Sequence, residues 1–218
     1  MLNTNRYWIV IDFMKSSKLL ILAAICLAAC NQPDKKTETS KQTIDTTDAT
    51  TTRTASIPTD KLIIPGKSIG QTALNDNGAD VTRRLGRPDA GDAAMGKSLS
   101  IWYANHNSKG YQTMIYASRQ MGTDDETSRV KQIRITSPWF ITKDNVRVGS
   151  TLEQIEDLYR PQKTAWFKKD SKKFDIYQGE GIAFEIDNQQ KCTAIMVFTP
   201  DIKPGATYLP FYDNLELY

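Results

Sequence analysis

Histidine and cysteine are scarce in this sequence of 218 residues, which contains one histidine, His106, and three cysteines. Two of the cysteines, Cys26 and Cys30, lie near the N-terminus, and Cys192 stands alone near the other end. A structural zinc site of His and Cys ligands needs about four of them in a cluster. The composition therefore excludes a zinc centre of this kind, and neither a metal nor another cofactor is predicted.

The sequence also lacks a basic stripe of the kind that nucleic-acid binding requires. It has 28 Lys and Arg against 25 Asp and Glu, but residues 1–29 hold three of the basic residues and one acidic residue, which leaves 25 against 24. Four lysines gather at positions 168–173, yet Asp170 and Asp175 are interleaved with them. Such a run is typical of a solvated loop. Nucleic acid is not an expected partner.

A short apolar run near the N-terminus has the architecture of a secretory signal. Two lysines precede residues 19–29, an apolar run broken only by Cys26 that ends in Leu27-Ala28-Ala29-Cys30. A membrane-spanning helix needs roughly 20 apolar residues, about twice this length. The ending resembles the lipobox of bacterial lipoproteins. This resemblance implies that residues 1–29 are a signal peptide and that Cys30 carries a lipid, through which the protein contacts a membrane.

The residues around this signal bear on the start of the chain and on its location. Asp12 precedes the two lysines and spoils a clean signal start, so Met14 is predicted to be the true first residue. In the lipoprotein sorting of the best-studied Gram-negative bacteria, an aspartate after the lipidated cysteine retains a protein in the inner membrane. Asn31 occupies that position here. We therefore expect a lipid-anchored protein of the cell envelope, at the outer membrane and facing the periplasm.

A threonine-rich tract follows the cysteine. One residue in three is threonine between positions 31 and 60, and few residues there are apolar. Such a composition cannot bury enough surface to offset the entropy of ordering the chain. Residues 30–60 are therefore predicted to be the lipidated cysteine and a disordered tether, whose mean reach as a coil is roughly 30 Å.

The remaining chain contains an internal similarity, which predicts two repeats at residues 61–138 and 139–200. Three anchors recur in the same order: Ile69-Gly70-Gln71-Thr72 as Val148-Gly149-Ser150-Thr151, Leu85-Gly86-Arg87-Pro88 as Leu158-Tyr159-Arg160-Pro161, and residues 133–138 as 195–200. In the second copy, apolar residues of 152–159 fall on one helical face. Helices are predicted at 79–85 and 152–159, each ended by a proline.

Three strands are predicted after each helix, from alternating apolar residues and hairpin-sized turns. They lie at 99–105, 111–118 and 130–137 in the first copy, and at 174–178, 182–187 and 193–198 in the second. The predicted fold class is α+β, with two tandem repeats, each a short helix followed by a three-stranded antiparallel meander, in one sheet. The C-terminal tail, 201–218, is rich in aromatic residues and is expected to pack on the domain.

This pattern resembles the small periplasmic lipoproteins of the BamE (SmpA/OmlA) type, and its tandem form resembles the β-lactamase inhibitory protein. The resemblance is carried by Pro65-Gly66-Lys67-Ser68, by the helix through Val81 and by Leu85-Gly86-Arg87-Pro88. The second copy departs from it, since Tyr159 replaces the glycine and no Pro-Gly opens that copy. The resemblance implies a binding module, either a helper of envelope assembly or an inhibitor-like binder.

No local motif predicts catalysis. The G-x-S-x-G match at 66–70 lacks a downstream acid and histidine in an α/β sheet, and the S-x-x-K match at 128–131 lies at the start of a strand. The loop at 75–80 lacks the charged end ligands of a calcium loop. His106 lies in a predicted turn, where general acid–base catalysis would need a positioned partner.

Aromatic residues are the better candidates for a functional surface, because Trp and Tyr are enriched where proteins bind one another. The candidates for partner binding are Trp139, Phe140, Trp166 and Tyr103, whereas Trp102 is expected in the core. The leading hypothesis is a non-enzymatic module that binds an envelope protein. The alternatives are an envelope hydrolase acting on cell-wall material, with a polar cleft of carboxylates or His106, and a carrier of a small ligand or lipid, with an apolar cavity.

Overall fold

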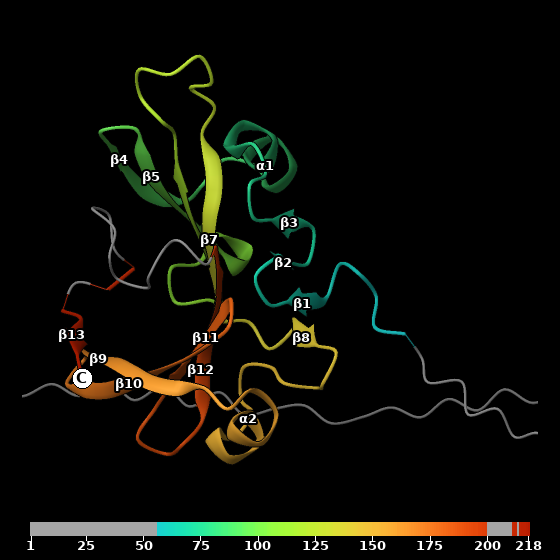
Figure 1. Cartoon of the computed structure of the whole chain (residues 1–218), viewed down its shortest axis with the longest axis vertical. Helices are drawn as coiled ribbons and strands as arrows, with labels where there is room; N and C mark the ends of the chain where they lie inside the picture. The colour runs from blue at the N-terminus through green and yellow to red at the C-terminus, as the bar shows by residue number, and fades with distance from the viewer. Residues whose placement is uncertain (1–55, 200–210, 213) are drawn as a thin grey trace, which may run out of the picture. The chain divides into compact units, whose positions relative to one another are not determined.

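Two sheets and two short α-helices make up most of the regular structure of the described residues, which are 56–199, 211–212 and 214–218 of this computed structural model (Figure 1). The predicted signal, the lipid attachment at Cys30 and the tether up to residue 55 lie outside these residues. No helix among the described residues has the length and apolar character that crossing a membrane requires.

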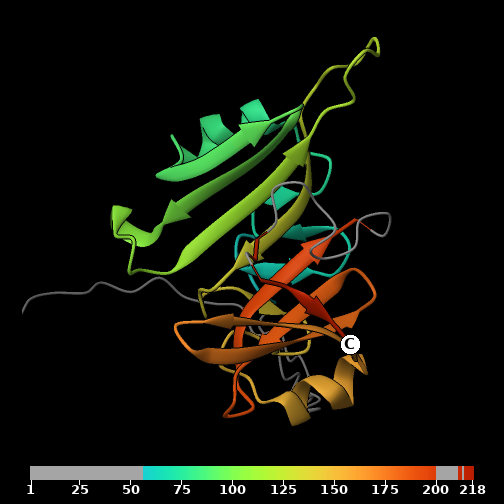
Figure 2. The same ribbon diagram turned by 90° about the vertical axis from the view of Figure 1, so that its left-hand side faces the viewer.

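The larger sheet has nine strands, and all its neighbouring strands pair antiparallel. In spatial order these are β13 (Glu216–Leu217), β9 (Gln162–Lys169), β10 (Lys172–Gly179), β11 (Ile182–Ile186), β12 (Cys192–Phe198), β7 (Arg129–Ile135), β6 (Gln112–Ser118), β5 (Lys97–Tyr103) and β4 (Ala90–Ala94). The first half, β4–β7, joins the second, β9–β12, where β7 pairs with β12. Figure 2 shows β4 at the outer end of this sheet.

The smaller sheet has four very short strands in the order β3 (Thr72–Ala73), β2 (Ser68–Ile69), β1 (Leu62–Ile64) and β8 (Ile141–Thr142). Its strands β1 and β8 run parallel and come from the beginning and the middle of the folded chain. The turn between β1 and β2 touches the larger sheet, since the Gly66 amide donates to the Gly181 carbonyl at 2.9 Å. The small sheet is thereby fixed to the turn between β10 and β11.

The two helices begin at polar caps. The side chain of Asn77 accepts from the Ala79 amide at the start of α1 (Gly78–Leu85), and Thr151 and Gln154 form a capping box at the start of α2 (Leu152–Tyr159). Such caps satisfy backbone amides that have no partner within the helix. Two residues of α2, Leu152 and Ile155, are buried, whereas α1 buries Val81 alone. Helix α1 is therefore attached to the sheet by a single apolar side chain.

Two apolar clusters occupy the two faces of the large sheet. The first joins both helices and the small sheet to one face, and its buried members include Ile63, Val81, Ile133, Ile155 and Val197. The second covers the opposite face over β9–β12, where the C-terminal residues Phe211, Tyr212 and Leu215 pack on neighbours that include Phe167, Met196 and Phe198. Because consecutive strand residues point to opposite faces, Met196 and Val197 belong to different clusters. The burial of both faces excludes water from the backbone of the sheet.

A charged group lies within the second face. Arg134 of β7 donates from Nε and Nη2 to the two carboxylate oxygens of Glu185 of β11, at 2.5 and 2.8 Å, and the Tyr212 hydroxyl donates to the same carboxylate. The three residues are 9%, 4% and 5% exposed. Burial raises the pKa of Tyr212 well above its ordinary value, as does the charge of Glu185, so the hydroxyl keeps its proton. The C-terminal segment is thus fixed by a hydrogen bond as well as by apolar contact.

The predicted fold class is wrong. The described residues are mostly β-structure in two sheets of nine and four strands, and they do not form a tandem of helices with three-stranded meanders in one sheet. Four strands follow each helix: β4 and β9 were not predicted, because Ala-Gly-Asp-Ala-Ala and Gln-Lys-Thr-Ala-Trp-Phe-Lys-Lys lack clear apolar alternation. The small sheet escaped prediction because its strands have two or three residues.

Candidate functional site

The two ends of the large sheet differ in whether their edges are covered. At one end, β13 pairs with β9 and the Tyr218 amide donates to the Thr164 carbonyl at 3.1 Å. The Tyr218 hydroxyl donates to Asp175 at 2.7 Å, and the Lys163 ammonium lies 2.8 Å from the same carboxylate. Burial acts to raise the pKa of Asp175, but the hydrogen bonds from Lys163 and Tyr218 outweigh it and lower that pKa. Asp175 is therefore ionised at neutral pH and holds this edge closed.

Neutralising Asp175 is expected to loosen β13. Asp175→Asn removes the charge that Tyr218, Lys163 and Lys173 face, so the amide of Tyr218 should exchange with solvent at least tenfold faster, as measured by NMR at about pH 6. The control is Asp170→Asn, in the exposed turn of the same hairpin. Since the pKa of Asp175 is lowered by folding, its contribution is fully present above a pH of about 4 and is lost as the pH falls further. Unchanged exchange in Asp175→Asn would contradict this account of the edge.

At the other end of the sheet, β4 pairs with β5 on one side and with no described strand on the other. Gly91, Asp92 and Ala93 are exposed, and β4 contains no lysine or proline. Proteins usually protect an edge strand with charged side chains, especially Lys, or with Pro, a bulge or a covering segment, because its unpaired amides and carbonyls invite another strand. The one charged residue of β4 is Asp92, whose carboxylate accepts from the Ala93 amide at 2.7 Å. Glycine is required at 91, since a Cβ there would lie 2.2 Å from the Leu99 carbonyl oxygen. This edge thus offers its backbone without bulky side chains.

An open groove of about 490 Å³, the edge groove, runs along β4 and is lined by residues 87–93 and 98–100. The register pairs Gly91 with Ser100 and Ala93 with Ser98, and residues directly opposite each other share a face. Asp92 pairs with Leu99 and points to the other face. The floor of the edge groove on the helix side is therefore made of small side chains.

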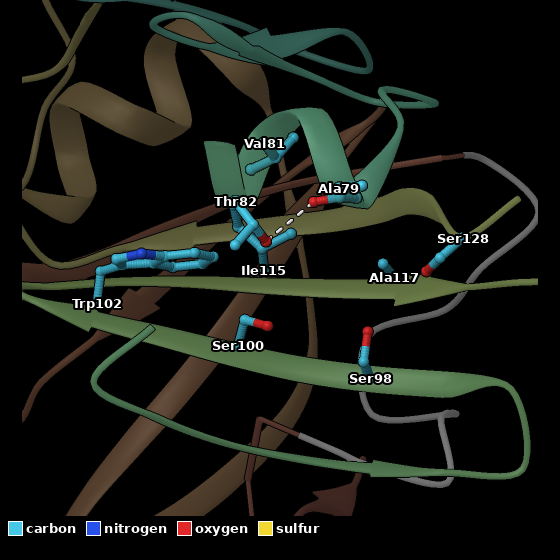
Figure 3. Close-up of a pocket in the computed structure, with 10 residues that line it drawn as sticks. Ala79, Val81, Thr82, Ser98, Ser100, Trp102, Ile115, Ala117 and Ser128 are labelled. Carbon is cyan, nitrogen blue, oxygen red and sulfur yellow. Dashed lines mark hydrogen bonds between the residues drawn. The ribbon is translucent and has the colours of Figure 1, made fainter. Parts of the chain in front are cut away.

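A second groove of about 320 Å³, the helix groove, continues from the first below α1 (Figure 3). Ser98 and Ser100 line both grooves, and in the helix groove Trp102, Ile115 and Ala117 extend the floor. Figure 3 shows the two serines of β5 pointing toward α1, with Trp102 at one end and Ser128 at the other. The indole N–H of Trp102 donates to the Gly86 carbonyl at 3.0 Å, which fixes this end wall.

The helix groove is the space that short side chains leave unfilled between α1 and the sheet. Only Val81 of α1 is buried, and Thr82 turns its hydroxyl back to the Gly78 carbonyl at 3.0 Å. Of the strand residues below, Ser98, Ser100 and Ala117 are too short to fill the layer between helix and sheet, and only Trp102 and Ile115 are large. Protein interiors normally leave few voids larger than a water molecule. A layer with this much open space is consequently a candidate site for a side chain of a binding partner.

The lining of the helix groove favours binding over catalysis. Its residues are Gly78, Ala79, Val81, Thr82, Ser98, Ser100, Trp102, Ile115, Ala117 and Ser128. None of these side chains is an acid or a base that titrates near neutral pH. A serine nucleophile requires an adjacent general base, and the lining supplies none. Among the described residues, no group of three or more His, Cys, Asp and Glu side chains is placed to hold a metal ion.

A histidine and a carboxylate do meet near the edge groove. Nδ1 of His106 lies 2.5 Å from Oδ1 of Asp89, and the Tyr103 amide donates to Oδ2 of Asp89 at 2.7 Å. The hydrogen bond from Tyr103, followed by that with His106, lowers the pKa of Asp89. The His106 side chain is 82% exposed and belongs to a short 3₁₀ helix, η1 (Ala104–His106). Within the described part of the chain, His106 contacts no serine, threonine or cysteine that it could activate.

The four aromatic residues predicted to bind a partner lie apart from one another. Trp139 is 55% exposed and lies below the Lys61 ammonium, 3.8 Å from its ring centre, whereas Phe140 lines an apolar cavity of about 230 Å³ between the two sheets. Trp166 is half-buried on β9, and Tyr103 ends β5. No aromatic contact joins any two of them in the described structure. Their exposure to a partner stays a prediction.

Comparisons with known proteins give little further information. No family model matches this chain, and no curated protein matches it significantly. Among solved structures, it is similar to a cysteine-rich secretory protein from Staphylococcus aureus, with 12% identity, a TM-score of 0.41 and coverage of 70% of this chain and 55% of the other. It is also similar to an extracellular protein containing an SCP domain from Bacillus anthracis, with 6% identity, a TM-score of 0.37 and coverage of 63% and 50%. This chain spans about half the length of each, and likenesses this distant assign no function.

The predicted resemblance to BamE-type lipoproteins and to the β-lactamase inhibitory protein is wrong. The solved structures that match are described as secretory and SCP-domain proteins. The motifs that carried the resemblance occupy connections: Pro65-Gly66 forms the turn between β1 and β2, and Gly86-Arg87-Pro88 links α1 to β4. Pro and Gly favour turns for local conformational reasons in many unrelated folds. Short Pro and Gly motifs therefore predicted turns and not a family.

Proposed function

We propose that this protein is a non-enzymatic binding module of the cell envelope, and that it binds an extended segment of another protein along β4. The single observation that carries this proposal is the contrast between the two edges of the large sheet. At one edge the two-residue strand β13 and the Tyr218 amide cover the middle of β9, while the five-residue strand β4 is exposed along its edge and bordered by a groove. Addition of a strand to an open edge is a recurrent mode of peptide recognition, in which main-chain hydrogen bonds give affinity and alternate side chains give specificity.

The side chains beside β4 define the segment that fits. A strand paired with β4 places alternate residues on the helix side, above Gly91 and Ala93, where the edge groove leads into the helix groove. Apolar side chains of medium size fit there, because most side chains of the groove floor are small and the apolar Ile115 lies at the bottom of the helix groove. The residue opposite Asp92 falls on the other face, where the exposed carboxylate accepts from the Ala93 amide and forms none of the ion pairs among the described residues. The preferred segment therefore alternates apolar, basic and apolar residues.

The envelope location rests on the sequence between Met14 and Cys30, which lies outside the described residues. The two alternative functions have less support. The cavity between the sheets, at about 230 Å³, is smaller than the 300–1,000 Å³ of typical ligand pockets, and the edge groove, which reaches about 490 Å³, is open and borders an exposed strand. The pair of His106 and Asp89 is open to solvent and lacks a nucleophile among the described residues.

The test is a selection of displayed random heptapeptides against the purified protein, followed by NMR titration of the selected sequences. We expect enrichment of apolar-basic-apolar segments, and the largest amide shifts at residues 90–94. In Ser98→Phe, the new ring fills the space that both grooves share, so the affinity of these peptides should fall at least tenfold.

The matched control is Ser108→Phe, which places the same ring on an exposed loop outside both grooves. This variant should bind the peptides as the unchanged protein does. Selected peptides that shift amides elsewhere, or that bind Ser98→Phe with unchanged affinity, would refute strand addition at β4.

A further inference from the structure

The hairpin of β9 and β10 brings like charges together. Its register pairs Lys172 with Lys169 and Lys173 with Lys168, directly across the two strands. All four lysines are exposed at the tip, and the turn between them contains Asp170 and Ser171. Like charges directly opposite each other destabilise a sheet. Two consecutive pairs of this kind therefore oppose the folding of the hairpin that contains them.

The protein leaves most of this charge uncompensated. Lys173 lies 3.4 Å from Asp175, but Lys168, Lys169 and Lys172 take part in none of the ion pairs among the described residues. The sequence pattern suggested that Asp170 and Asp175 would balance the run as in a solvated loop. The structure assigns Asp175 instead to Tyr218 and Lys163, at 2.7 and 2.8 Å. The tip retains a concentrated positive charge.

Aromatic rings lie directly behind this charge. The Lys168 and Lys173 ammonium groups lie 5.6 and 4.8 Å from the ring centre of Trp166, and Lys173 is also 5.3 Å from that of Tyr218. Trp and Tyr rings are amphipathic and favour the boundary between water and lipid, where Lys can remain at the headgroups. A narrow tip with lysines in front and aromatic rings behind matches this arrangement.

We propose that the tip of the β9–β10 hairpin docks on an anionic lipid surface, with Lys168, Lys169 and Lys172 at the phosphate groups. An anionic lipid is the partner that its shape favours, since two short strands present charge at one point and offer no track for a polymer such as nucleic acid. The lipid predicted on Cys30 would attach the same chain to such a surface. A basic patch of this kind adds a second contact with the membrane beside a lipid anchor.

The test uses the predicted mature chain, residues 30–218, with Cys30→Ser so that no lipid contributes. This chain contains the whole compact unit of residues 52–218. Sedimentation with vesicles measures its binding to phosphatidylglycerol mixed with phosphatidylcholine, and to phosphatidylcholine alone. Binding is expected only with the anionic vesicles and should weaken as salt rises from about 50 to 500 mM.

Lys169→Glu separates binding from stability. A lysine near an anionic surface contributes about fivefold in affinity, so reversal of its charge should weaken vesicle binding on the order of thirtyfold. The same change replaces a repulsive pair with an attractive one opposite Lys172, and the Tm should rise by about 1–3 °C. The control Lys109→Glu alters net charge equally on another exposed loop and should leave binding within twofold.

Three results would overturn the proposal. They are equal binding to neutral vesicles, unchanged binding of Lys169→Glu, and tighter binding to DNA than to anionic vesicles. The last result would assign the tip to a different class of partner. A fall in Tm together with lost binding in Lys169→Glu would mean that the lysine pairs stabilise the hairpin, which also contradicts the proposal.

Discussion

Replacing Glu185 by alanine is expected to lower the free energy of unfolding by about 3–5 kcal/mol, since removal of one partner leaves a buried charge without compensation. Arg134 and Glu185 are joined by two hydrogen bonds on a face that Tyr212 covers. Burial acts to lower the pKa of Arg134, but the charge of Glu185 more than offsets it and the pKa is raised. In Glu185→Ala the guanidinium keeps its desolvation penalty and loses its carboxylate, while Tyr212 loses its acceptor.

Urea unfolding followed by tryptophan fluorescence measures this loss. The control is Glu180→Ala, which removes an exposed glutamate from the turn between β10 and β11 and should change stability by less than about 0.5 kcal/mol. The double variant Arg134→Met with Glu185→Leu should recover most of the stability, because apolar residues of similar volume often replace a buried ion pair without cost. A loss below about 1 kcal/mol in Glu185→Ala would show that water reaches Arg134.

The network of Arg134, Glu185 and Tyr212 illustrates which parts of the structure local sequence patterns can predict and which they cannot. The helix expected at 152–159 coincides with α2, because a threonine cap and a single apolar face are local signals. Strands β7, β11 and β12 lie close to predicted positions, because their apolar residues alternate. Arg134 occupies the polar position of such an alternation, between Ile133 and Ile135, and that position by itself indicates a solvent-facing side chain. Its burial depends on Glu185, 51 positions away, and on Tyr212 of the C-terminal segment. No local pattern contains that information.

The candidate site was missed for a related reason. Aromatic and titratable residues are the sequence signals that indicate a functional site, whereas the grooves beside β4 are defined by small side chains in Ala-Gly-Asp-Ala-Ala and Ser-Leu-Ser. The available signal was the alternation of serine with apolar residues in 98–101, which predicts a strand with one face that packs against nothing large. Two features of the site follow from the order of all nine strands and not from any one of them. The first is that β4 ends the sheet, and the second is that α1 leaves space above it.

Gly181→Ala is expected to destabilise the fold by about 3–5 kcal/mol, through the contact that joins the two sheets. A Cβ at Gly181 would lie 2.5 Å from both the amide nitrogen and the Cα of Gly66. These are backbone atoms, which cannot rotate away as a side chain can. Gly181 also has a φ of +68°, a left-handed conformation that costs other residues about 1–2 kcal/mol. The hydrogen bond from the Gly66 amide to the Gly181 carbonyl would break as the turns separate.

Gly149→Ala separates the two contributions to this loss. Gly149 has a φ of +96°, but no atom lies within 4 Å of the position that its Cβ would take. Its replacement should therefore lower the free energy of unfolding only by the cost of the left-handed backbone conformation, about 1–2 kcal/mol in the same urea measurement. If Gly181→Ala lowers the free energy of unfolding no more than Gly149→Ala does, the close approach of the two turns does not contribute to stability and the small sheet is fixed elsewhere. A larger loss of stability in Gly181→Ala, accompanied by faster exchange of the Gly66 amide, would place the contact between the sheets at these two glycines. The Gly66 amide reports on this contact because it donates to the Gly181 carbonyl.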